Sequence, residues 1–269
     1  MADHADANRA HFDTVADSYD STHGGGQIQH KILHALLAVP GVEWDDETTS
    51  LLEFACGTGL MSQKLAQYVQ RIVGIDISAR MVDVFNGKAR NQGIPEDEMS
   101  AYAFDLLQHG VDAAPVPLRA QFDVVVVSMA YHHLPDIAAA TATLAACLRP
   151  GGWLLVVDLL WKAELFEVFT AAKAARAARA LPEDLADSEY MRALDTVSHV
   201  GGIRREDALA ALESAGLTAC SVTQALSIDR ELPARLVPAG VDVSAVSLPS
   251  ADPAKVVLRF PVFVAAGQR

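Results

Sequence analysis

Short apolar, mostly β-branched runs alternate between positions 49 and 160 with longer stretches in which apolar residues recur every three or four positions. The first pattern is typical of buried strands, and the second is typical of helices with one apolar face. The runs predict five strands, at 49–55, 71–77, 99–106, 122–129 and 152–160. The stretches predict helices, at 60–69, at 79–93 and from Asp136 to the turn at 150–152. Such alternation indicates an α/β fold with a parallel sheet and right-handed crossovers.

The alternation changes after position 160. Residues 161–200 predict two helices where a sixth strand would come, and 205–216 predict one more. Strands are expected at 217–226 and 255–267, and Pro261 predicts a bulge or an edge position in the second. The stretch between them, 227–254, is expected to be a long loop. We therefore expect four segments: an N-terminal helical segment (1–48), an α/β core (49–160), a helical insertion (161–200) and a C-terminal completion of the sheet (201–269).

Composition and charge narrow the class of protein. Of the 269 residues 51% are hydrophobic and 20% charged, which suits one large domain or one domain with a cap. A net charge of −13 disfavours nucleic acid and anionic lipid as partners. Three dispersed cysteines (Cys56, Cys147 and Cys220) predict reduced thiols and no metal site. The N-terminus lacks a signal-peptide pattern and the run from 122 to 134 is too short to span a membrane, so we expect a cytoplasmic protein.

The turn after the first predicted strand is the candidate ligand site. The chain passes through Ala55-Cys56-Gly57-Thr58-Gly59 directly into a helix, so a ligand can approach bare backbone there. A dinucleotide site prefers a third glycine where Ser62 stands, which disfavours a nicotinamide-dependent oxidoreductase. Asp76 ends the second strand, where a carboxylate can accept hydrogen bonds from ribose. Glu53 lies on an apolar strand, and the cost of burying a lone carboxylate favours a cationic ligand.

Five segments in order resemble the motifs of class I S-adenosylmethionine-dependent methyltransferases that act on small molecules. They are LLEFACGTG (51–59), GIDIS (74–78), AFDL (103–106), FDVVVVSMAYHHLPD (122–136) and LRPGGWLLVVD (148–158). HFDTVADSYD (11–20) resembles the N-terminal segment of the same family. The resemblance implies a Rossmann-like sheet of seven mostly parallel strands with an antiparallel last strand, helices on both faces and a helical cap inserted after strand five. It implies S-adenosylmethionine as cofactor and S-adenosylhomocysteine as product.

The resemblance also assigns residues to the methionine end of the cofactor. Glu53 is expected near the methionine amino group, and Ala55, Gly57 and Gly59 are expected to line it with backbone. Ala55 departs from the family, which more often has glycine there. Ser128, at the end of the fourth strand, is expected to approach the same end.

The nucleoside end follows in the same way. Asp76 is expected to take the ribose hydroxyls, although a helix cap is the alternative role of this carboxylate. Ile77 and Met81 are expected to flank the adenine. Asp105 is expected to accept from the adenine amine, with Leu106 beside it.

The acceptor side is less defined by the sequence. Methyl transfer is an in-line displacement, and a hydroxyl acceptor benefits from a base. His132 and His133 follow the fourth strand and are candidate bases, with His199 as a further candidate, but each of them could instead be structural. Tyr19 is expected to close over the cofactor. Residues 161–200 are the expected acceptor cap.

The sequence thus predicts an enzyme that moves a methyl group from S-adenosylmethionine to an oxygen or nitrogen atom of a small molecule. C-methylation of a quinone-like or lipid-like acceptor stays open, as does a catalytically silent cofactor-binding scaffold. We expect no nucleic-acid partner and a monomer or homodimer.

Overall fold

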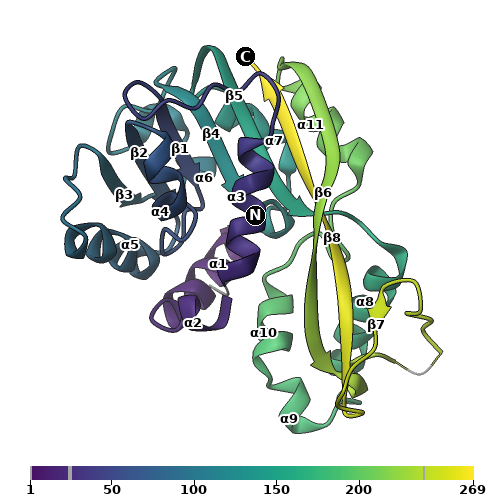
Figure 1. The fold of residues 1–269 in the computed structure, drawn as a ribbon. Coiled ribbons are helices and arrows are strands. Elements are labelled where there is room, and N and C mark those ends of the chain that lie inside the picture. Colours follow the sequence, from purple (N-terminus) through teal and green to yellow (C-terminus); the bar gives the residue numbers. More distant parts are fainter. Residues whose placement is uncertain (1, 24–25, 239) are drawn as a thin grey trace.

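The computed structural model describes residues 2–23, 26–238 and 240–269 and has one mixed sheet (Figure 1). Its strands are β1 (Ser50–Phe54), β2 (Arg71–Asp76), β3 (Met99–Ala103), β4 (Phe122–Ser128), β5 (Leu148–Leu159), β6 (Thr218–Pro233), β7 (Ser247–Leu248) and β8 (Lys255–Gln268). The order is β3-β2-β1-β4-β5-β8-β6, with β7 beside β8. Strands β1 to β5 pair in parallel, and β8 is antiparallel to both neighbours. The predicted fold class is confirmed, with the two-residue β7 as an eighth strand.

Helices cover both faces of the sheet. One face packs against α3 (Gly26–Leu37), α4 (Ser62–Leu65) and α5 (Ala79–Asn91), and the other against α6 (Leu106–His109), α7 (Ile137–Ala145) and α11 (Arg205–Ser214). The successive valines of β4 alternate between the two apolar cores, as expected for a strand buried on both faces. Among the described residues, four short 3₁₀ helices lie at Ala66–Tyr68, Val111–Ala113, Tyr131–His133 and Ala234–Leu236.

Two helices precede this core, α1 (Ala2–Val15) and α2 (Tyr19–His23). They lie at the carboxyl ends of β1 and β4, where strand order reverses (Figure 1). Carboxylates hold them to the core. Asp13 accepts from Ser78 Oγ at 2.6 Å, and Asp20 accepts from Thr58 Oγ1 at 2.6 Å. The N-terminal segment therefore covers the place where an open parallel sheet binds its ligands.

The hairpin of β6 and β8 extends beyond the sheet and carries the remaining helices, α8 (Ala163–Ala177), α9 (Glu183–Ala186) and α10 (Glu189–Asp195) (Figure 1). A separate apolar core joins these helices to the hairpin, with Leu165 and Met191 against Leu232 and Leu258. The expected long loop, 227–254, is wrong in its first part, because residues 226–233 continue β6 and pair with 255–262.

Three predicted boundaries also differ. Strand β5 begins at Leu148 rather than 152, because Leu148 pairs with Phe122 ahead of a register shift in the β4–β5 pairing, and α7 ends correspondingly early, at Ala145. Strand β3 ends at Ala103, before Asp105, which caps α6 instead. Pro261 lies in an inner strand and is paired with Ser227 of β6. Its carbonyl accepts from the Leu160 N–H, so its polar backbone groups face β5, just beyond the last β5–β8 pair, Leu159 with Val262, and the missing N–H breaks no bond to β6.

Candidate functional site

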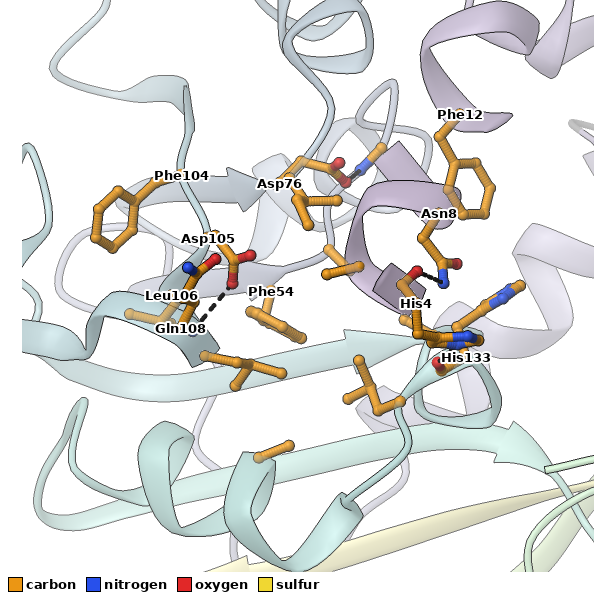
Figure 2. A pocket seen from close by; sticks show the side chains of 18 of the residues that line it. His4, Asn8, Phe12, Phe54, Asp76, Phe104, Asp105, Leu106, Gln108 and His133 are labelled. Atoms are coloured by element: carbon orange, nitrogen blue, oxygen red, sulfur yellow. Dashed lines mark hydrogen bonds between the residues drawn. The ribbon is translucent and has the colours of Figure 1, made fainter. Parts of the chain in front are cut away.

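A cavity of about 540 Å³ opens at the carboxyl ends of β1, β2 and β4, beneath α1 (Figure 2). One end is formed by the segment after β3 and by α7, and the other by α1 and the turn after β4. Most of the predicted cofactor residues line it, namely Tyr19, Ala55, Gly57, Asp76, Ile77, Met81, Asp105, Leu106 and Ser128. Glu53 and Gly59 are not among the lining residues.

The two glycines of the turn have different surroundings. Both have left-handed backbone, with φ of +52° at Gly57 and +80° at Gly59. A Cβ on Gly57 would meet no atom within 4 Å, whereas one on Gly59 would lie 2.5 Å from Phe85 Cδ2. Gly57 thus leaves backbone open to the cavity, and Gly59 lets the turn pack on α5. Ala55 also has left-handed backbone, φ +54°, a conformation that costs a residue with a side chain more than it costs glycine.

Asp76 lies between the turn and α5. Its Oδ2 accepts from the Gly57 N–H at 2.7 Å, and its Oδ1 accepts from the Ser78 N–H at 2.8 Å. The N-cap of α5 is Ser78, whose Oγ accepts from the Met81 N–H at 3.1 Å, so Asp76 is not that cap. Burial raises the pKa of Asp76 to about 6 against the effect of these hydrogen bonds. A ligand hydroxyl that donated to this carboxylate would favour its ionised form.

The two carboxylate oxygens of Asp105 have different surroundings. Its Oδ1 accepts from the Gln108 N–H at 3.0 Å and so caps α6. Its Oδ2 is buried and forms an ion pair with Arg9 at 3.5 Å, but it has no hydrogen-bond partner among the described residues. Since the ion pair leaves its hydrogen-bonding capacity unused, this atom can accept from an N–H of a ligand. Leu106, beside it, is buried and apolar.

Glu53 lies under the turn rather than in the cavity wall. It is 3% exposed, and its carboxylate accepts from Ser62 Oγ. Burial raises the pKa of Glu53 to about 7, although the hydrogen bond from Ser62 opposes the rise. The serine that stands in place of a third glycine is therefore the partner of this carboxylate.

Of the three candidate histidines only His133 lines the cavity. Its Nδ1 donates to the Thr196 carbonyl at 2.9 Å, which leaves the lone pair on Nε2. Burial, reinforced by the neighbouring His132, lowers the pKa of His133 to about 3. The imidazole is thus neutral at physiological pH and presents an acceptor atom.

His132 points to a different partner. Its Nδ1 lies 2.7 Å from Asp158 Oδ1, and its backbone N–H donates to Asp158 Oδ2 at 3.2 Å. Burial alone would raise the pKa of Asp158, but His132 and these hydrogen bonds outweigh burial and lower it. The backbone N–H of His199 donates to the His132 carbonyl at 2.9 Å, and its buried Nε2 has no hydrogen-bond partner among the described residues. Neither imidazole is part of the cavity wall.

The end of the cavity near His133 includes residues that sequence reasoning missed. His4, Asn8 and Phe12 all come from α1, and the Phe12 ring lies edge-on to His133 with centroids 5.4 Å apart. The resemblance of 11–20 to a family segment was the only signal that this region belongs to the site. Tyr19 also lines the cavity, and burial together with the Asp76 charge raises the pKa of Tyr19 to about 12.

Residues 161–200 do not line the cavity. They contribute from behind it, where the Thr196 carbonyl holds His133 and Ser198 Oγ lies 2.8 Å from His4 Nε2.

Within 2–23, 26–238 and 240–269 no cluster of His, Cys, Asp or Glu has metal-binding geometry, and no helix is long and apolar enough to cross a membrane.

Comparison with known proteins identifies a domain within the chain and finds solved structures of the same fold. Residues 52–156 match the methyltransferase domain family. An uncharacterized methyltransferase of Schizosaccharomyces pombe is 45% identical over 125 residues, which are 46% of this chain and 43% of that protein. A ubiquinone biosynthesis O-methyltransferase of Rhizobium etli is 28% identical over 127 residues, 46% of this chain and 48% of that protein. The chain thus matches about half the length of these curated relatives.

The solved structures extend the likeness in fold to the whole chain. Magnesium protoporphyrin IX methyltransferase of Synechocystis, crystallised with bound S-adenosylhomocysteine, superimposes with a TM-score of 0.59 at 15% identity and covers 99% of both chains. At this identity the likeness concerns the fold alone.

Proposed function

We propose that this chain, whose residues 52–156 match the methyltransferase domain family, transfers a methyl group from S-adenosylmethionine to an oxygen or nitrogen atom of a small molecule. One observation carries the proposal: the Asp76 carboxylate lines a cavity at the reversal of strand order, beside bare Gly57 backbone. That is the position at which α/β sheets of this kind bind nucleosides.

The cavity fits this cofactor in charge and in hydrogen bonding. Asp76 would hold the ribose hydroxyls, and Oδ2 of Asp105, which has no hydrogen-bond partner among the described residues, would accept from the adenine amine. Gly57 leaves room for the methionine part, and Tyr19 and α1 would cover it. Bound in this way, S-adenosylmethionine supplies an electrophilic methyl group on a positively charged sulfur.

The residues of the chain would contribute mainly by positioning. Alignment of two reactants in an in-line displacement can supply roughly 7–11 kcal/mol of the barrier, provided that water is kept out. Helix α1 closes the cavity with His4, Asn8 and Phe12, and the loop at 196–198 fixes His4 and His133 by hydrogen bonds. The neutral His133 would accept a hydrogen bond from the acceptor rather than repel a cationic cofactor.

An oxygen acceptor is supported by the ubiquinone biosynthesis O-methyltransferases among the relatives, of which the Rhizobium etli protein is one. Two alternatives to an O- or N-methyltransferase are a C-methyltransferase and a catalytically silent scaffold. A C-methyltransferase acting on a quinone-like or lipid-like molecule would use the same cofactor residues. A silent scaffold would bind the cofactor through the same residues and transfer no methyl group, so turnover distinguishes it.

Isothermal titration calorimetry with S-adenosylmethionine, S-adenosylhomocysteine and NAD tests the proposal. We expect the first two to bind and NAD not to bind. Asp76→Ala should weaken S-adenosylhomocysteine at least a hundredfold, because hydrogen bonds to a charged group contribute about 1.5–3 kcal/mol each. Asp112→Ala removes an exposed carboxylate that is paired with Arg119 away from the cavity and should leave affinity unchanged. Binding of NAD alone, or equal affinity of both variants for S-adenosylhomocysteine, would end the proposal. If S-adenosylmethionine binds as expected, a metabolite screen for methyl acceptance identifies the substrate.

A further inference from the structure

Asn8 is a buried polar residue whose hydrogen bonding is half complete. It is 7% exposed and lines the cavity at the end near His133. Its Nδ2 donates to the His4 carbonyl at 3.0 Å and to the Thr196 carbonyl at 3.5 Å. Because both partners are carbonyl oxygens, the orientation of the amide is fixed, and Oδ1 must face away from them. Oδ1 is buried and has no hydrogen-bond partner in the part of the chain that the structure describes.

The surroundings of this oxygen do not satisfy it. In Figure 2 the Asn8 amide lies between Phe12 and His133. Phe12 offers only aromatic carbon, and Nδ1 of His133 is already used by the Thr196 carbonyl, so Nε2 is an acceptor like the amide oxygen itself. A buried acceptor left unpaired costs about 1–3 kcal/mol, which is a reason to look for a donor that comes from outside the chain.

We propose that this end of the cavity binds the methyl acceptor through a hydroxyl or N–H group that donates a hydrogen bond to Asn8 Oδ1, while an aromatic part of the same molecule packs on Phe12. The identification of that molecule as the methyl acceptor rests on the proposed function. Asn8 is a positioning and specificity residue, because an amide oxygen orients a donor but does not take its proton.

The two acceptor atoms also define which molecules this end rejects. A carboxylate or phosphate has no hydrogen to donate at neutral pH and would place its charge against Asn8 Oδ1 and His133 Nε2. An apolar molecule without a donor would leave Oδ1 unpaired, and a site built around such a hydrogen bond discriminates strongly against analogues that lack it. The expected substrate class is therefore phenols, enols, amines and N–H heterocycles.

Two probes of nearly equal shape test this preference in the wild-type protein. 2-Naphthol carries a hydroxyl where 2-methylnaphthalene carries a methyl group. Affinities are measured by ligand-observed NMR on protein saturated with S-adenosylhomocysteine, whose binding is verified first by calorimetry. We expect 2-naphthol to bind at least tenfold more tightly. Equal affinities, binding of neither probe, or a preference for the hydrocarbon would overturn the inference.

Variants assign the preference to Asn8. Asn8→Leu should reduce the ratio of affinities to about one by weakening 2-naphthol, while S-adenosylhomocysteine still binds. Thr14→Leu is the matched control, because it replaces a polar side chain at an exposed position of α1, where the hydroxyl donates to the Ala10 carbonyl, and leaves the Asn8 amide and its partners intact; it should keep the preference. Retention of the full preference in Asn8→Leu would overturn the inference, and should that variant not fold, the wild-type ratio decides. Failure of the wild type to bind S-adenosylhomocysteine would instead count against the proposed function.

Discussion

Replacing Glu53 with glutamine should stabilise the protein at alkaline pH and change it little at acid pH. The carboxyl is buried, and burial raises its pKa from 4.5 to about 7. The folded chain therefore holds this proton more tightly than the unfolded chain does. By linkage, the contribution of Glu53 to the free energy of unfolding falls as the pH rises from about 4.5 to about 7, and it stays low above that range.

The size of the effect follows from the same values. A rise in pKa from 4.5 to about 7 corresponds to about 3 kcal/mol, at about 1.36 kcal/mol per pKa unit. Glutamine cannot ionise, but its side-chain oxygen can still accept from Ser62 Oγ. The variant should thus exceed the wild type in free energy of unfolding by less than about 1 kcal/mol at pH 5 and by about 3 kcal/mol at pH 8.

Urea unfolding followed by circular dichroism at pH 5, 6, 7 and 8 measures this difference. The difference in free energy of unfolding between Glu53→Gln and the wild type is the useful quantity, because other groups also make stability depend on pH. The lowered pKa of His133 acts in the opposite direction to Glu53: its contribution to stability rises with pH between about 3 and 6.5, and it does so equally in both proteins. Asp112→Asn, at an exposed carboxylate, is the control and should show no gain at pH 8. A difference that is the same at pH 5 and pH 8 would refute the reasoning.

Three further predictions concern the turn and the cavity. Gly59→Ala should lower the free energy of unfolding by about 2 kcal/mol or more, because the new methyl group would clash with Phe85. Gly57→Ala should cost less stability but weaken the binding of S-adenosylhomocysteine about tenfold. Similar losses of stability and of affinity in the two variants would contradict the different roles of the two glycines. Ala55→Gly should raise the thermal midpoint by about 2–4 °C, because glycine accepts the φ of +54° without strain, and a lower midpoint would count against it. His133→Ala should reduce turnover and spare cofactor affinity, as measured by initial rates and calorimetry; undiminished turnover would remove His133 from the acceptor site.

The sheet and the position of the cavity could be predicted from the sequence because the information is local. The valines of β4, the glycine turn and the carboxylate at the end of β2 each report on their own element, and strand order follows from the α/β pattern. The length of β6 could not be predicted, because residues 227–233 contain charged residues and Pro233 and are held as a strand only by pairing with β8. Their pattern alone is typical of a loop.

The contribution of α1 was hidden for a different reason. Asn8 stands in a polar helix whose pattern marks no face, and its burial depends on the loop at 196–198, which is almost 190 positions away in the sequence. The reverse holds for His132, a candidate base from its place beside His133 in the sequence. Its residue type suits that role, but a contact with Asp158, at the end of the next strand, draws the ring away from the cavity wall. Both outcomes are tertiary contacts that no local pattern contains.

The low pKa of His133 constrains how the proposed reaction handles the acceptor's proton. An imidazole with a pKa of about 3 holds a proton weakly, so it is suited to orient a hydroxyl or N–H group and not to carry its proton away. An amine attacks through a lone pair that is present before transfer, and a phenol gains a nucleophilic oxygen when its proton passes to bulk water before it binds. Under the proposed function, kcat/KM should therefore change with the pKa of the acceptor across a series of substituted substrates. A pH profile that shows one fixed ionisation near 6.5 for every acceptor would mean that a histidine takes the proton after all.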